Sequence, residues 1–293
     1  MKRKTTLLKE YIQDEKALVM PGAYDSLSAR IIEKIGFKAV AVGGFSLTAT
    51  ILGKPDVSLL TMTEMVNHVR NMADAVDIPV FADGETGYGN IINVCRTVRE
   101  LERAGVAGLF IEDQAFPAKC GLMEGIEVIP AEEMVAKIMA AVDTRVDGDM
   151  VVMARTDAYK VYGLDEAINR ANRYREAGAD LIFVVTPNRM EDLQRVAREV
   201  HAPKMAVVGE DGTSVLTVKD LAEIGFNVVS FPLSAIFSAA KGVWQTMQAL
   251  YETGSTAGRL NNMIYFQEFT KLVGLEEIIR LQNHYHVKSR REK

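Results

Sequence analysis

Short apolar runs recur along the chain, and an amphipathic stretch follows each of them. The runs lack the alternation of apolar and polar residues seen in half-solvated strands, which is typical of parallel strands buried on both faces. Eight segments have this character: 17–20, 39–42, 79–82, 108–111, 150–154, 181–185, 205–208 and 228–231. The pattern therefore predicts eight strands in a parallel sheet, each followed by a helix.

The stretches between these runs have the spacing of surface helices. They are residues 26–35, 63–75, 91–104, 131–142, 164–177, 190–200, 218–224 and 233–251. Gly36, Gly105, Gly178 and Gly225 each come just after such a stretch, where glycine commonly ends a helix. Eight units of even size, without a dinucleotide-binding fingerprint, favour a closed (β/α)8 TIM barrel over an open doubly wound sheet. We expect residues 1–257 to form the barrel and 258–293 a helical extension of the same domain.

Composition narrows the class of protein. The chain has 293 residues, of which 48% are hydrophobic and 25% charged, so a large core can form. The net charge of −5 and the lack of a basic stripe argue against a nucleic-acid partner. Two cysteines provide neither a disulfide framework nor a zinc motif. No apolar run reaches the length of a membrane span or of a signal core, so we expect a cytoplasmic protein without a membrane partner.

In a barrel of this type the chemistry lies at the carboxyl ends of the strands. Four successive predicted strands end in polar or glycine-rich segments: Gly43-Gly44-Phe45-Ser46, Asp83-Gly84-Glu85, Glu112-Asp113-Gln114 and Arg155-Thr156-Asp157. Because parallel strands end on the same rim, these segments are expected to surround one site.

The carboxylates of this rim predict a metal site. Asp83 and Glu85 are two residues apart and point the same way along a strand, and Glu112 ends the next strand. Neighbouring carboxylates repel one another, and Mg²⁺, which prefers oxygen ligands and keeps several waters, relieves that repulsion. We therefore expect Mg²⁺, with Mn²⁺ as the alternative. Capping of the following helix is the other explanation for a single carboxylate at such a position.

Three further features suggest binding and catalysis. Arg155 ends an apolar strand, where it can grip a carboxylate in a bidentate fork or pair with a carboxylate such as Asp157. Gly44, Phe45 and Ser46 offer backbone N–H groups and a hydroxyl to a substrate carboxylate. Cys120 lies between Lys119 and a glycine in a polar loop, unlike a core cysteine.

The chain resembles the isocitrate lyase and phosphoenolpyruvate mutase superfamily from about residue 6 to residue 285. Six segments carry the resemblance: Pro21-Gly22-Ala23-Tyr24-Asp25-Ser26, Gly53-Lys54-Pro55-Asp56, Asp83-Gly84-Glu85-Thr86-Gly87-Tyr88-Gly89, Ile111-Glu112-Asp113-Gln114, Lys119-Cys120-Gly121 and Ala154-Arg155-Thr156-Asp157-Ala158. Within the superfamily it is most similar to short-chain lyases such as 2,3-dimethylmalate lyase and 2-methylisocitrate lyase. The resemblance implies a homotetramer of TIM barrels whose C-terminal helices are exchanged between subunits.

The resemblance also implies roles for individual residues. Asp83 corresponds to the direct Mg²⁺ ligand, Glu85 and Glu112 reach the metal through water, and Asp56 lies near it on a loop. Gly44, Phe45 and Ser46 hold a substrate carboxylate, and Arg155 binds the oxo-acid end. Cys120 corresponds to the catalytic acid on a gating loop. The implied activity is Mg²⁺-dependent carbon–carbon cleavage of a small substituted 2-hydroxy di- or tricarboxylate to an oxo acid and a carboxylic acid.

Five positions depart from the lyases of this family. Ala118 and Leu122 stand where a cation and a histidine are usual. Glu85 stands where an aspartate is usual, Val185 where a glutamate is usual, and Ala206 near a usual asparagine. Three alternatives to the lyase stay open at this point. They are an oxaloacetate decarboxylase or hydrolase, an enzyme of phosphonopyruvate-type P–C chemistry, and a barrel that binds an oxo acid without turning it over.

Overall fold

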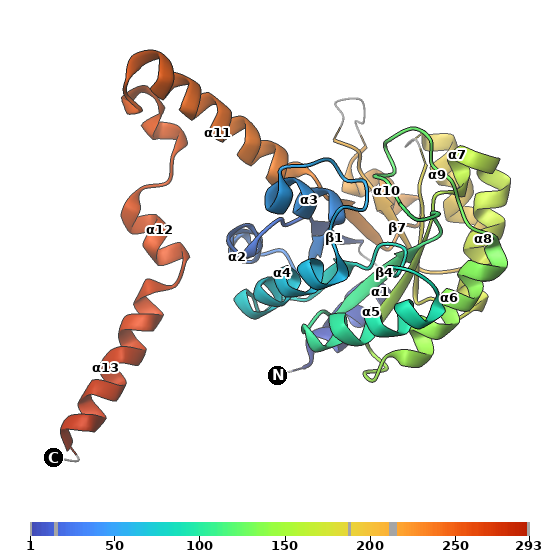
Figure 1. Ribbon diagram of the computed structural model, residues 1–293, viewed down its shortest axis with the longest axis horizontal. Helices are drawn as coiled ribbons and strands as arrows, with labels where there is room; N and C mark the ends of the chain where they lie inside the picture. The colour runs from blue at the N-terminus through green and yellow to red at the C-terminus, as the bar shows by residue number, and fades with distance from the viewer. Residues whose placement is uncertain (1, 15–16, 187–188, 211–215, 292–293) are drawn as a thin grey trace. The chain divides into compact units, whose positions relative to one another are not determined.

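The computed structural model describes residues 2–14, 17–186, 189–210 and 216–291, and Figure 1 traces their elements along the chain. The chain forms two compact units, residues 1–236 and 237–293. The first unit carries the sheet, and the second is helical. The expected division of the chain into residues 1–257 and 258–293 stays a prediction about its domains.

The first unit is a (β/α)8 TIM barrel, as predicted. Within the described residues its strands are β1 (Leu18–Pro21), β2 (Val40–Val42), β3 (Val80–Asp83), β4 (Gly108–Glu112), β5 (Val151–Thr156), β6 (Leu181–Val184), β7 (Lys204–Val207) and β8 (Val228–Phe231). They pair in parallel in the order β1-β8-β7-β6-β5-β4-β3-β2. A parallel bridge between Gly22 and Ala41 brings β1 next to β2, so the sheet is nearly closed. All the predicted strands are confirmed.

Helices connect the strands of the first unit. They are α1 (Lys4–Gln13), α2 (Ser26–Ile35), α3 (Gly44–Leu52), α4 (Met62–Ala75), α5 (Ile91–Arg103), α6 (Ala131–Thr144), α7 (Ala158–Tyr162), α8 (Leu164–Glu176), α9 (Met190–Glu199) and α10 (Val218–Glu223), with α11 (Ser234–Thr253) beginning at its end. The sequence pattern did not predict α3 and α7. Most of α3 is apolar, so it shows little helical periodicity, and α7 is too short to show one.

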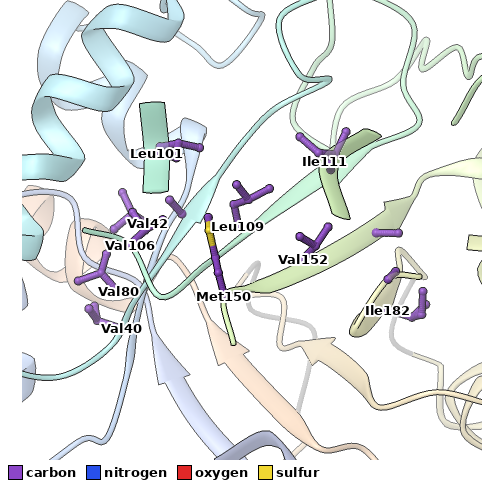
Figure 2. Close-up of a cluster of buried hydrophobic side chains, with 14 of the residues drawn as sticks. Val40, Val42, Val80, Leu101, Val106, Leu109, Ile111, Met150, Val152 and Ile182 are labelled. Carbon is purple, nitrogen blue, oxygen red and sulfur yellow. The ribbon is translucent and has the colours of Figure 1, made fainter. Parts of the chain in front are cut away.

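Alternate side chains along the strands enter two different cores. Val152 and Ile182 belong to a large cluster that also contains residues of the surrounding helices, such as Leu101 of α5 (Figure 2). Met153 and Leu181, their neighbours in sequence, belong to a second cluster made of strand residues and of α1. The second cluster therefore fills the inside of the barrel, which is a packed core and not a pore.

Helix α1 closes the amino end of the barrel. Its Leu8 and Ile12 side chains are buried in the inner cluster. The hydroxyl groups of Thr5 and Thr6 donate hydrogen bonds to Asp147 and Asp149, which lie just before β5. Because this end is closed, a ligand site inside the barrel has its opening at the carboxyl ends of the strands.

The second unit contains most of α11, a 3-10 helix η1 (Ala257–Asn262), α12 (Phe266–Leu272) and α13 (Leu275–Arg291). Its helices leave large apolar side chains exposed, among them Trp244, Tyr251 and Phe266. No described residue after 236 belongs to either of the two apolar clusters. None of the helices in the described part of the chain has the length and apolar character needed to cross a membrane. The exchange of these helices between subunits stays a prediction.

Candidate active site

A cavity of about 180 Å³ lies at the carboxyl ends of the strands. Residues from both sides of the barrel line it, and six of the residues proposed from the sequence are among them. These are Gly44, Phe45, Asp56, Asp83, Cys120 and Arg155. Ser46, Glu85 and Glu112 do not line the cavity, although Ser46 follows directly after Phe45 and both glutamates lie close to Asp83 and Arg155. The structure therefore brings the ends of β2, β3 and β5 to one cavity, and the roles of these residues stay a prediction.

The carboxylates of β3 and β4 are buried close together. Asp83 is 7% and Glu112 3% exposed. Burial raises the pKa of Glu85 well above its usual range, and the charges of Asp83, Glu112 and Asp56 raise it further. Burial, followed by the charge of Asp83, also raises the pKa of Asp56 to about 6. This much negative charge in a buried place favours a bound cation.

Glu85 lies in this cluster because of a turn after β3, and not because it shares a strand face with Asp83 as expected. Strand β3 ends at Asp83, so Glu85 does not share a strand face with it. Glu85 has a φ of 52°, in the left-handed region that a residue with a side chain rarely adopts. The turn is held by Asp83, whose Oδ1 accepts the Glu85 N–H at 2.8 Å, and by the Glu112 N–H, which donates to the Glu85 carbonyl at 3.0 Å.

The glycine segment after β2 forms the start of a helix. Gly43 precedes α3, and the Gly44 N–H at the amino end of this helix donates to Asp83 Oδ2 at 2.8 Å. A Cβ at position 44 would lie 2.2 Å from Glu85 Oε1 and 3.3 Å from Asp83 Oδ2. Glycine is therefore required here because two carboxylates approach the backbone. The helix amino end also places a partial positive charge at the site.

Arg155 joins the carboxylates of two strands. Its Nε and Nη2 each donate to the Asp157 carboxylate at 2.9 Å, and its Nη1 lies 3.0 Å from Glu112 Oε2. Burial alone would lower the pKa of Arg155, but Asp157 and Glu112 raise it well above its ordinary value. The ion pair with Asp157, one of the two readings of the sequence, is thus present. These contacts use three of the five guanidinium N–H groups, and Arg155 also lines the cavity.

The loop that carries Cys120 lies against the same site. The Cys120 N–H donates to the Asp56 carbonyl at 3.2 Å. A Cβ at Gly121 would lie 2.7 Å from Arg155 Nη2, so the loop backbone packs directly on the guanidinium. The Gln114 side chain holds the loop through hydrogen bonds with both the N–H and the carbonyl of Lys119. Burial raises the pKa of the Cys120 thiol, so the thiol is protonated at neutral pH.

A buried hydrogen-bond network behind the site was missed by the sequence analysis. The Asp113 carboxylate accepts from Thr156 Oγ1 at 2.7 Å, from the Asp157 N–H at 2.9 Å and from Tyr174 Oη at 2.9 Å, and it pairs with Arg170 at 3.2 Å. Asp113 thereby connects the end of β4 to the end of β5, which carry Glu112 and Arg155. Its partners Arg170 and Tyr174 lie on α8, far along the chain, so no local sequence pattern indicates that they bind Asp113.

Two of the positions that depart from the lyases place apolar side chains in the wall of the cavity. Leu122 and Val185 line the cavity beside Gly121 and Arg155. Ala206 also borders the cavity, but it packs in the outer cluster, whereas its neighbour Val207 packs against the inner one. Met205 and Val207 are therefore the residues of β7 whose side chains face the inside of the barrel.

The group of side chains around Asp83 fits Mg²⁺. Among the described residues, no three His, Cys, Asp or Glu side chains are arranged so that they could together hold a metal ion. Mg²⁺ usually takes one or two carboxylates and completes its shell with water and substrate oxygens. The Tyr88 hydroxyl is buried and has no hydrogen-bond partner among the described residues. Burial raises its pKa, and the charges of Glu85, Asp83, Asp56 and Glu112 raise it further. Such a hydroxyl near carboxylates suits a site that contains ordered water.

Comparison with known proteins agrees with this description. A family model described as phosphoenolpyruvate phosphomutase matches residues 8–251. A 2,3-dimethylmalate lyase from Eubacterium barkeri is 44% identical over 95% of this chain and 96% of its own. A 2-methylisocitrate lyase from Aeropyrum pernix is 38% identical over 94% of this chain and 89% of its own.

Solved structures give the same result. Oxaloacetate acetylhydrolase in complex with the inhibitor 3,3-difluorooxalacetate superimposes with a TM-score of 0.91 at 30% identity, covering 97% of both chains. Phosphonopyruvate hydrolase in complex with oxalate and Mg²⁺ superimposes with a TM-score of 0.89 at 28% identity, covering 97% of this chain and 99% of that one. The chain therefore belongs to the phosphoenolpyruvate mutase and isocitrate lyase superfamily.

Proposed function

We propose that the protein is a Mg²⁺-dependent lyase that cleaves a carbon–carbon bond in a small substituted 2-hydroxy di- or tricarboxylate. The observation that carries this proposal is the arrangement of buried carboxylates, the α3 amino end and Arg155 around one side of the cavity. The similarity to 2,3-dimethylmalate lyase and 2-methylisocitrate lyase supports it. The products are an oxo acid such as pyruvate or glyoxylate and a second carboxylic acid.

Asp83 and Asp56, which line the cavity, would hold Mg²⁺, with Glu85 and Glu112 reaching it through water. When bound, Mg²⁺ supplies Lewis-acid stabilisation of negative charge on the oxygen substituents of the substrate. Gly44 and Phe45, which line the cavity, bind a substrate carboxylate at the start of α3, and the role of Ser46, which does not line it, stays a prediction. Arg155 binds the oxo-acid end with the N–H groups that Asp157 and Glu112 leave available. These contacts hold the substrate in one orientation, which lowers the entropic cost of reaching the transition state.

Cleavage breaks the bond between C2, which carries the hydroxyl, and C3. The hydroxyl proton leaves to water as C2–O becomes a carbonyl, and the electron pair of the broken bond goes to C3, where the neighbouring carboxylate delocalises it. The Cys120 thiol then protonates C3 and is itself reprotonated from water, so the protons balance. A raised pKa suits this role, because the donor must be protonated at neutral pH. The Cys120 loop, packed on Arg155, excludes water from the carbanion.

A turnover panel tests the proposal. The protein is incubated with Mg²⁺ and either 2,3-dimethylmalate, 2-methylisocitrate, oxaloacetate or phosphonopyruvate, and oxo acid, oxalate and phosphate are measured. Release of oxo acid from either hydroxy acid, abolished by EDTA, is the expected result. Release of phosphate and pyruvate from phosphonopyruvate, with neither hydroxy acid cleaved, would instead assign P–C chemistry. Binding without turnover of any compound would assign a non-catalytic barrel.

Oxaloacetate cleavage is the second candidate function. The fold similarity to oxaloacetate acetylhydrolase at a TM-score of 0.91 favours it, and the carboxylate-rich side of the cavity suits that substrate equally. Both reactions break a C2–C3 bond and leave a carbanion that must be protonated, but hydrolysis also adds water at C2. The products therefore separate the two functions: oxalate and acetate from oxaloacetate assign the hydrolase, and an oxo acid from a 2-hydroxy acid assigns the lyase.

We also propose that the protein is a homotetramer in which the C-terminal helices of one subunit pack on a neighbour. The apolar side chains that the second unit leaves exposed support this, since such side chains seldom remain in contact with water. Sedimentation equilibrium should give four times the monomer mass of 32.3 kDa. A monomer whose helices 257–291 resist hydrogen exchange would show instead that they pack on their own barrel.

A further inference from the structure

The two sides of the cavity differ in charge. The side formed by β2 to β5 presents Asp56, Asp83 and Arg155. The side formed by β6, β7, β8 and β1 presents apolar side chains: Met20, Phe183, Val185, Met205, Val207 and Leu233. Among the described residues of this second side, which we call the apolar half, no charged side chain lines the cavity.

The polar groups of the apolar half are weak partners for an anion. Thr186 and Ser230 are its hydroxyl side chains among the described residues, and the Ser230 hydroxyl already donates to the Met20 carbonyl at 2.9 Å. The nearest arginine in sequence, Arg189, pairs with Asp192 at 2.8 Å. The segments 187–188 and 211–215, which lie outside the described residues, contain no lysine or arginine.

The charges of the site also limit the number of substrate carboxylates that the cavity can bind. Arg155 is the one cationic side chain among the described residues that line the cavity, and it already pairs with Asp157 and Glu112. The two carboxylates of a malate-type substrate can use the metal, Arg155 and the start of α3. A third carboxylate would extend into the apolar half, where no described residue that lines the cavity offers it a cation. A buried unpaired carboxylate is costly, whereas an alkyl group gains free energy there.

We infer that the substrate carries an alkyl group in the apolar half and is an alkyl-substituted 2-hydroxy dicarboxylate rather than a tricarboxylate. This inference rests on the proposed function, because it places the C2 end of the substrate on the charged side. The alkyl group is the C3 substituent, which occupies the space that a carboxymethyl group would have in a tricarboxylate. Val185, directly after β6, and Val207, at the end of the neighbouring strand β7, determine how long that group can be.

The test compares substrates that differ in the C3 substituent alone. 2-Methylmalates with a methyl, ethyl or propyl group at C3 are measured against 2-methylisocitrate, which carries carboxymethyl there. We expect kcat/KM to rise by about fourfold for each added methylene until the apolar half is filled. The tricarboxylate should be at least about 100-fold poorer than the propyl compound of similar size. Equal or better use of 2-methylisocitrate, or no dependence on alkyl length, would overturn the inference.

Variants of Val207 locate the effect in the apolar half. Val207→Lys adds a cation and should reduce the preference for propyl over carboxymethyl by at least about tenfold. The matched control is Val146→Lys, an identical change at a valine that is 88% exposed and outside the cavity, which should leave the preference unchanged. Val207→Phe, which keeps the half apolar but shortens it, should lose the propyl substrate and retain the methyl one. A preference that is the same in wild type and in both Val207 variants would contradict the assignment.

Binding without turnover separates this inference from the proposed function. Calorimetry in the presence of Mg²⁺ compares propylsuccinate with tricarballylate, neither of which carries the 2-hydroxyl needed for cleavage. Tighter binding of propylsuccinate by at least about tenfold supports the apolar half even if no malate is cleaved, in which case the lyase proposal alone fails. Tighter binding of tricarballylate overturns the inference even if the malates are cleaved.

Discussion

The two sides of the cavity are built from the same kind of β/α unit but present different side chains, charged on one side and apolar on the other. On the side of β2 to β5, strand ends and the following turns bring carboxylates, Arg155 and the amino end of α3 within hydrogen-bond distance of one another. On the side of β6 to β1, equivalent inward positions carry Val185 and Val207. In the proposed function, the charged side supplies the chemistry common to many oxo acids, and the apolar half selects among their precursors.

The largest effect is expected from removing the charge of Asp83. Asp83→Ala should lower Mg²⁺ affinity by at least about 100-fold and abolish turnover, because the carboxylate that lines the cavity is lost. The fold should persist, since the variant removes a buried charge whose pKa is raised by burial. Isothermal calorimetry with Mg²⁺ measures the affinity, and Asp74→Ala, at an exposed aspartate of α4, is the control. An unchanged Mg²⁺ affinity in Asp83→Ala would show that the metal does not bind on the charged side.

The next largest effect concerns the proton donor. Cys120→Ser should lower kcat by about 10²–10⁴-fold, the usual contribution of a placed general acid, and leave Mg²⁺ and oxalate affinity unchanged. Cys95→Ser, at the other cysteine of the chain, should retain full activity. Wild-type turnover in Cys120→Ser would show that Cys120 is not the proton donor.

Arg155→Lys tests whether the guanidinium fork matters beyond its charge. Lysine retains the cation but loses the bidentate contact with Asp157 and the N–H groups that face the cavity. We expect about 10–100-fold weaker oxalate binding, measured by calorimetry, with Mg²⁺ affinity nearly unchanged. Arg103→Lys, in an exposed pair with Glu100, is the matched control. Equal oxalate affinity in Arg155→Lys would mean that the arginine serves the fold alone.

A smaller effect is expected behind the site. Asp113→Asn retains the shape of the side chain but weakens its bonds to the Asp157 N–H and Tyr174 and its pairing with Arg170. If Asp113 positions β5, the KM for substrate should rise by about tenfold while kcat changes less. A purely structural role would instead lower the melting temperature and the amount of active enzyme, with KM unchanged.

The smallest effect is the rate at which Cys120 is alkylated. Burial raises the pKa of the Cys120 thiol, although Arg155 offsets part of the increase. Because the thiolate is the reactive form, the iodoacetamide rate in a Cys95→Ser background should still be rising above pH 9. Oxalate with Mg²⁺ should slow the reaction further by covering the thiol. A rate that reaches its plateau below pH 8 would show that the thiol is ionised in the free protein.

The sequence predicts the barrel well because its strands are continuous apolar runs and its longer helices have a regular period. It also predicts the strand ends that meet at the site, since parallel strands end on one rim. It does not predict that Gly44 begins a helix, because α3 is largely apolar and shows little periodicity. Nor does it predict the left-handed turn at Glu85, whose N–H donates to Asp83 and whose carbonyl accepts from the Glu112 N–H.

Two other features of the site depend on residues far apart in sequence. Asp113 meets Arg170 and Tyr174 through the packing of α8 on the barrel, which no local pattern encodes. The apolar half is suggested by Val185 and Ala206 in the sequence, but the alternation of strand β7 places Val207, not Ala206, inside the barrel. Which of two neighbouring residues faces inward is set by strand register, and a single sequence fixes it poorly for a short apolar run.

The most direct test of the proposed chemistry is the fate of the solvent proton. The protein is given 2,3-dimethylmalate and Mg²⁺ in D₂O, pyruvate is trapped by reduction as it forms, and both products are examined by mass spectrometry. Cleavage between C2 and C3 with protonation at C3 predicts equal amounts of pyruvate and propionate, with one deuterium in the propionate C2 position and none in the trapped pyruvate. Deuterium in the pyruvate methyl group, or the absence of propionate, would contradict the account.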